Sequence, residues 1–108
     1  MELLHAQAAI VSAIIADAPS PAWEHITVRV AADGAAPQIE ASALCWQATG
    51  GLAEIALQPG AQSAAALAAW LALDAVRQNP QARRLMLEID YPGRYRLLSG
   101  AAIKGAAI

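Results

Sequence analysis

The sequence predicts an α+β fold with the element order α-β-β-β-α-β-β. Two alanine-rich segments have helical periodicity, five shorter runs alternate apolar with polar residues, and the helices do not alternate with single strands. Such an order is typical of a mainly antiparallel sheet with the helices packed on one face and the other face polar and open. We expect one α+β domain over residues 1–108.

The first helix is predicted over residues 2–17. Its apolar residues recur at spacings of three, four and seven, as they do on one side of an amphipathic helix: Leu3, Leu4, Val11, Ile14 and Ile15. Pro19 and Pro21 end this helix, because proline disfavours helical backbone angles in the residue before it.

Three strands connected by short turns follow. The apolar period becomes two from Trp23, and the strands are expected near 23–30, 38–47 and 52–57. The turns between them are predicted at Asp33-Gly34 and Thr49-Gly50-Gly51. The residues predicted to point inward are Ile26, Val28, Val30, Ile39, Ala41, Ala43, Cys45, Ala53, Ile55 and Leu57.

The second helix is predicted to begin at Gln62 or Ser63 and to continue to about Gln78, before Pro80. Its circumference is so apolar that we expect it to be buried on more than one side, by the fold or by another chain.

Two more alternating runs, 85–90 and 94–98, are joined by Tyr91-Pro92-Gly93 and are expected to form a hairpin. We expect residues 99–108 to form a flexible or extended tail.

Composition excludes several function classes. Hydrophobic residues make up 57% of the chain and charged residues 15%, which is too apolar for a disordered protein. The net charge of −2 argues against nucleic-acid binding, and the single cysteine, Cys45, excludes an internal disulfide. The start of the chain lacks the basic region of a signal peptide, and Pro59-Gly60 interrupts the longest uncharged stretch. We therefore expect a cytoplasmic protein that contacts no membrane.

Residues for catalysis are scarce. His5 and His25 have no partner at metal-ligand spacing, and Cys45 alternates with apolar residues as a small core residue would. We expect no catalytic residue, no cofactor and no metal. A small hydrolase that uses the outward-facing carboxylates has the least support: Glu40, Glu54, Glu88 and Asp90.

The outward face of the sheet is the candidate binding surface. It combines charged side chains with a tryptophan, a residue type that often anchors protein interfaces. The partner-binding residues that we predict are Arg29, Glu40, Trp46, Glu54, Met86, Glu88, Arg94 and Arg96. For Trp46, packing under the C-terminal tail or against helix ends is the alternative. Trp70 in the second helix is either a core residue or part of a self-association surface.

The organisation resembles that of YezG-like bacterial immunity proteins. The similarity lies in the first helix and its Pro-x-x-Trp entry to a strand at Ser20-Pro21-Ala22-Trp23-Glu24-His25-Ile26-Thr27-Val28. It continues through the turn at Asp33-Gly34, a second helix, and the hairpin Leu85-Met86-Leu87-Glu88-Ile89-Asp90-Tyr91-Pro92-Gly93-Arg94-Tyr95-Arg96. The resemblance implies a small intracellular protein that binds and neutralises a cognate bacterial toxin domain without catalysis. It assigns no binding residue.

The sequence therefore supports two hypotheses about function. The first is a protein-binding module, most concretely an immunity protein with a toxin domain as its partner. The alternative is a homo-oligomeric domain, such as a homodimer, with a structural or small-ligand-binding role, in which the second helix and Trp70 form the subunit interface.

Overall fold

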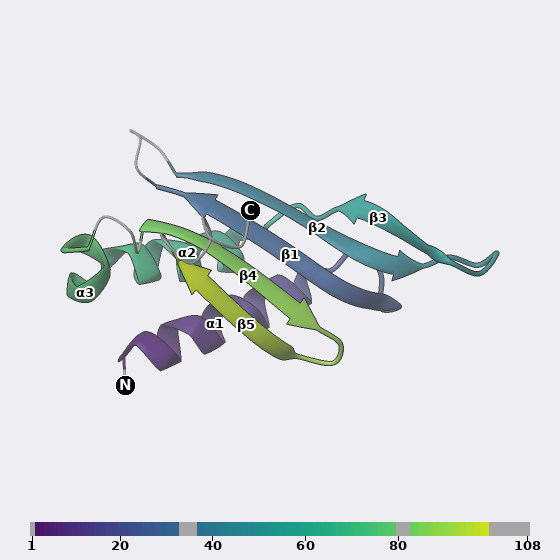
Figure 1. Cartoon of the computed structure of the whole chain (residues 1–108), viewed down its shortest axis with the longest axis horizontal. Helices are drawn as coiled ribbons and strands as arrows, with labels where there is room; N and C mark the ends of the chain where they lie inside the picture. Colours follow the sequence, from purple (N-terminus) through teal and green to yellow (C-terminus); the bar gives the residue numbers. More distant parts are fainter. Residues whose placement is uncertain (1, 33–36, 80–82, 100–108) are drawn as a thin grey trace.

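The computed structural model describes residues 2–32, 37–79 and 83–99, and it confirms the predicted α+β fold (Figure 1). The predicted order of elements is present, with one additional short helix. The elements are α1 (Glu2–Ala16), β1 (Trp23–Ala31), β2 (Gln38–Trp46), β3 (Leu52–Ala56), α2 (Ala61–Ala72), α3 (Asp74–Arg77), β4 (Arg84–Asp90) and β5 (Arg94–Ser99).

The five strands form one sheet in the order β3-β2-β1-β4-β5. Every pair of neighbouring strands is antiparallel, and β1 lies in the centre between the hairpins β2–β3 and β4–β5. Both long helices lie behind the sheet in Figure 1, so one face is covered and the other is open. This is the layered arrangement that the sequence predicts.

The core lies between the sheet and the two long helices. Every second residue of β1 and of β4 is apolar and points into the core, and α1 and α2 each contribute one side of the helix. The fully or almost fully buried side chains from these four elements include Ile10, Ile14, Ile26, Val28, Leu67, Trp70, Leu85, Leu87 and Ile89.

The second helix is shorter than predicted. Leu73 has extended backbone angles, φ −65° and ψ 139°, which end α2 before α3 starts at Asp74. The change of direction brings Val76 into the core, and Asp74 accepts a 2.9 Å hydrogen bond from Arg77 within α3. Packing of Val76 thus accounts for the break in a segment with high helix propensity.

The start of α2 also differs from the prediction. Gly60 is the N-cap and the helix begins at Ala61, while Ser63 is fully buried and donates to Asp17 rather than capping the helix. Within the described chain α2 is buried on one side only, at Ser63, Leu67 and Trp70. Its other side consists of exposed alanines, which corrects the expectation of burial on several sides within the fold.

A carboxylate joins the two helices. Asp17, just after α1, accepts hydrogen bonds from Ser63 Oγ at 2.6 Å and from the Gly60 amide at 2.7 Å. These two donors, Ser63 first, lower the pKa of the Asp17 carboxyl. A Cβ at Gly60 would lie 3.0 Å from Asp17 Oδ1, so this close approach favours glycine. The chain is therefore held where it enters α2.

The predicted turns and tail have mixed outcomes. Gly50 and Gly51 have φ of 87° and 82°, which confirms the turn after β2. Ser99 is the last residue of β5 and not part of a tail. The predicted turn at Asp33-Gly34 and residues 100–108 lie outside the described residues.

No helix among the described residues is long and apolar enough to cross a membrane.

Candidate functional site

The open face of the sheet is the candidate site. Residues that are opposite each other in neighbouring antiparallel strands share a face, so the strand register identifies its members. From β3 to β5 they are Leu52, Glu54, Ala56, Ser42, Leu44, Trp46, Glu40, His25, Thr27, Arg29, Met86, Glu88, Asp90, Arg94, Arg96 and Leu98. All eight residues that the sequence predicts to bind a partner therefore lie on one surface.

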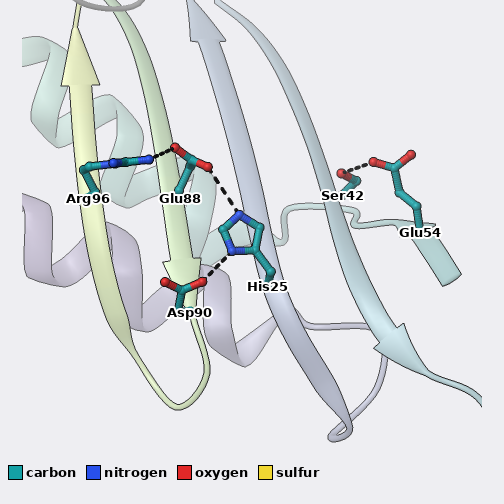
Figure 2. Close-up of polar contacts among 6 residues, drawn as sticks. All are labelled: His25, Ser42, Glu54, Glu88, Asp90 and Arg96. Atoms are coloured by element: carbon teal, nitrogen blue, oxygen red, sulfur yellow. Dashed lines mark hydrogen bonds and ion pairs between the residues drawn. The ribbon is translucent and has the colours of Figure 1, made fainter. Parts of the chain in front are cut away.

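A histidine between two carboxylates occupies the middle of this face (Figure 2). His25 Nδ1 lies 2.6 Å from Asp90 Oδ1, and His25 Nε2 lies 3.4 Å from Glu88 Oε1. Glu88 Oε2 also accepts a 2.8 Å bond from Arg96, which raises the pKa of the Arg96 guanidinium. These four side chains form a charge network across β1, β4 and β5.

The sequence predicts only part of this network. Glu88 and Arg96 are predicted binding residues, and alternation places Asp90 outward, but the sequence identifies no partner for His25 at metal-ligand spacing. The register pairs His25 with Asp90 directly across β1 and β4. Alternation in the sequence shows that both point outward; it does not show which strand lies beside which.

The other side of the open face is different in character. Ser42 donates a 3.1 Å hydrogen bond to Glu54 Oε2, as Figure 2 shows, and the Trp46 indole donates a 2.7 Å bond to Glu24. Trp46 remains 51% exposed, and Leu52, directly opposite on β3, is 44% exposed. We call Trp46 and Leu52 the apolar pair.

Arg29 and Glu40 lie opposite each other between these two regions. With Thr27, Ala41 and Ser42 they line a shallow depression of about 150 Å³. Pockets for small molecules usually have about 300–1,000 Å³. The depression is therefore too small to favour a small ligand over a larger, flatter partner.

Trp70 lies in the core and not on this surface. Its side chain is 4% exposed, and its buried indole nitrogen has no hydrogen-bond partner among the residues that the structure describes. The structure therefore supports the interpretation of Trp70 as a core residue and not as part of a self-association surface. Cys45 is likewise buried, as predicted.

Both ring nitrogens of His25 face carboxylates, Nδ1 that of Asp90 and Nε2 that of Glu88. Among residues 2–32, 37–79 and 83–99, no group of three or more His, Cys, Asp or Glu side chains could hold a metal ion.

Comparison with protein-family models, with curated protein sequences and with solved structures finds no match to this chain.

Proposed function

We propose that this protein is a protein-binding module that uses the open face of its sheet. The observation that carries this proposal is the exposed apolar pair, Trp46 and Leu52, set among charged side chains on a face that both long helices leave uncovered. Tryptophan and arginine contribute much of the energy of protein interfaces, and polar side chains around them form the rim.

The partner class that we propose is a bacterial toxin domain. The resemblance to YezG-like immunity proteins supports this class. A stable protein interface buries about 600–1,000 Å² on each partner. Binding of this kind can block a toxin without any catalytic residue in this chain.

Catalysis is not part of the proposed function. Two of the four outward carboxylates that a hydrolase could use are engaged by other side chains: Glu88 contacts both His25 and Arg96. Asp90 contacts His25 in turn. These contacts link side chains of β1, β4 and β5 on the open face, which suits a rigid recognition surface.

Co-expression with the product of a neighbouring toxin gene tests this proposal. We expect wild-type protein to bind that product and to restore growth. Trp46→Ala should weaken binding at least about tenfold, because truncation of a central aromatic costs about 2 kcal/mol or more.

The matched control is Leu4→Ala, since Leu4 is 60% exposed but lies on α1 rather than on the open face. This variant should bind like the wild type. Equal binding by wild type, Trp46→Ala and a multiple open-face variant would contradict the proposed surface.

A homo-oligomer is the second candidate, and the exposed side of α2 favours it. That side consists of small apolar side chains: Ala61, Ala64, Ala65, Ala68, Ala69 and Ala72, with Gln62 at its start. Light scattering at tens of micromolar protein distinguishes the two candidates. A monomer at this concentration would exclude the homo-oligomer. A dimer that Ala68→Glu dissociates would support it.

A further inference from the structure

The sheet has two outermost strands, β3 and β5, and their backbones are oriented differently relative to the open face. Hydrogen-bonded pairs alternate along antiparallel strands. The bonds from the Leu57 amide to Ala41 and from the Gln47 amide to Gly51 set the alternation between β2 and β3. The backbone groups of Leu52, Glu54 and Ala56 therefore point away from β2, toward the outer edge.

The same reasoning applied to β5 gives the opposite result. The bonds from the Tyr91 amide to Glu24 and from the Ala32 amide to Arg83 set the alternation of β4. On β5, the residues with outward backbone groups are then Tyr95 and Leu97, whose side chains pack toward the helices. Only on β3 do the residues with outward backbone groups also present their side chains on the open face.

Charge distinguishes the two edges further. Between Arg29 and Arg77 the sequence contains no Lys, Arg or His, and Glu54 is the charged residue of β3. In the described part of the chain Glu54 bonds to Ser42 Oγ and makes no ion pair. The β5 edge instead carries Arg94 and Arg96.

The apolar pair lies at the same edge. Leu52 and Trp46 are directly opposite each other across β3 and β2, two residues from the position of Glu54. The turn end of this hairpin extends beyond both long helices in Figure 1. An exposed edge strand with apolar side chains and one charge is a template for pairing with another strand.

We propose that β3 binds an extended segment of the protein partner as an additional strand, and that this segment carries a lysine or arginine two residues from an apolar side chain. This inference rests on the proposed function and specifies where and how the partner binds. In an antiparallel addition, a residue opposite Glu54 would exchange both backbone hydrogen bonds with it; in a parallel addition the bonds of Glu54 would go to the residues on either side of the opposite one. In both orientations the opposite side chain shares the open face with Glu54. A basic side chain there meets the Glu54 carboxylate, and the apolar side chain meets Leu52 and Trp46.

A palindromic peptide, acetyl-Thr-Val-Thr-Lys-Thr-Val-Thr-amide, tests the inference because its pattern is the same in parallel and antiparallel orientation. The readout is hydrogen exchange of single amides in the full chain. We expect saturating peptide to slow exchange at Leu52, Glu54 and Ala56 by about tenfold or more, because bonded amides exchange only on opening. Tyr95 and Leu97, the outward amides of β5, are the internal control and should not change.

Three variants separate backbone pairing from charge. Ala56→Pro removes an outward amide that bonds to no other strand of the sheet. Edge strands tolerate proline at such a position, so the variant should fold, and it should abolish binding. Glu54→Lys should weaken binding at least about tenfold and favour the peptide with Glu in place of Lys. Arg77→Glu, an opposite change of charge on α3 and away from the open face, should leave binding within about twofold of wild type. Circular dichroism tests whether each variant is folded. If Glu54→Lys is not folded, Glu54→Gln takes its place.

Each other outcome overturns the inference. No slowing at Leu52, Glu54 and Ala56 in the wild type does so directly. Slowing of Tyr95 and Leu97 without peptide, increasing with protein concentration, would identify the β5 edge of a second copy as the occupant. If Trp46→Ala disrupts toxin binding while Ala56→Pro does not, the open face binds its partner without an added strand, and only this inference fails.

Discussion

The β4–β5 and β2–β3 hairpins flank the same central strand, yet they differ in almost every physical property. β4 buries Leu85, Leu87 and Ile89 almost completely. In β3 no residue is fully buried, and the fully buried residues of β2 are the small Ala43 and Cys45, while Ile39 and Ile55 are only partly buried against the core. The β4–β5 hairpin therefore contributes more to the core, and the β2–β3 hairpin leaves Trp46 and Leu52 exposed.

The charges follow the same division. The carboxylates of the β4–β5 hairpin have partners: Glu88 contacts Arg96 and His25 of β1, and Asp90 contacts His25. On the β2–β3 hairpin Glu40 and Glu54 have no described cation partner. A fold can separate stability from binding in this way, because side chains that do not hold the core remain free to contact a partner.

The largest expected contrast is between two leucines. Leu87→Ala in β4 removes a fully buried side chain and should lower the free energy of unfolding by about 2–5 kcal/mol. Leu52→Ala in β3 should change it by no more than about 0.5 kcal/mol, since Leu52 is already half exposed. Urea unfolding measures both. Equal losses would show that the β2–β3 hairpin is also part of the stabilising core.

Acid unfolding tests the hydrogen bonds by which Asp17 joins the end of α1 to the start of α2, next to the end of the β2–β3 hairpin. The Asp17 carboxyl has a lowered pKa in the folded chain, so its stabilisation is present above the pKa of the unfolded chain. That stabilisation is lost as the pH falls through the lower, folded pKa. Asp17→Asn should therefore reduce the urea midpoint near pH 7 and flatten its decline below about pH 4.

Ser63→Ala removes one of the two donors to Asp17 and should shift the acid transition in the same direction, by less. Ser12→Ala on the exposed side of α1 is the control. A pH profile of Asp17→Asn that parallels the wild type would show that another group causes the acid transition.

Trp46→Ala should separate stability from binding. We expect a loss of about 1 kcal/mol in unfolding free energy, because the side chain is half exposed and donates one hydrogen bond to Glu24. Partner binding should decrease much more. A stability loss comparable with that of Leu87→Ala would place Trp46 in the fold rather than in the interface.

The smallest effect is expected at the ion pair between Glu88 and Arg96. Arg96 is exposed, and exposed pairs contribute little because solvent and salt screen them. Arg96→Gln should leave the urea midpoint within error, and any difference should disappear at 1 M salt, where the Debye length is about 3 Å. A large effect that persists in salt would contradict this ranking.

Local patterns were sufficient to predict most of the elements and the direction of their side chains. Alternation correctly places Glu54, Glu88 and Arg96 on the open face. The helix break at Leu73 could not be predicted, because Leu73 has good helix propensity and only the packing of Val76 makes the break favourable. The role of Asp17 could not be predicted either, since its donors Gly60 and Ser63 are more than forty residues away.

Sequence alone determined the α+β class, the order of the elements and the face on which each strand residue lies, because these depend on spacing within short segments. Short turns already indicate that β1, β2 and β3 are neighbours and that β4 pairs with β5, but only the tertiary structure decided that β4 lies beside β1. That choice pairs His25 with Asp90 and Glu88, and it leaves β3 at an edge with Trp46 and Leu52 exposed. The order of the two hairpins in the sheet depends on how segments that are distant in the sequence pack around one core. It cannot be derived from the short-range periodicity of each segment.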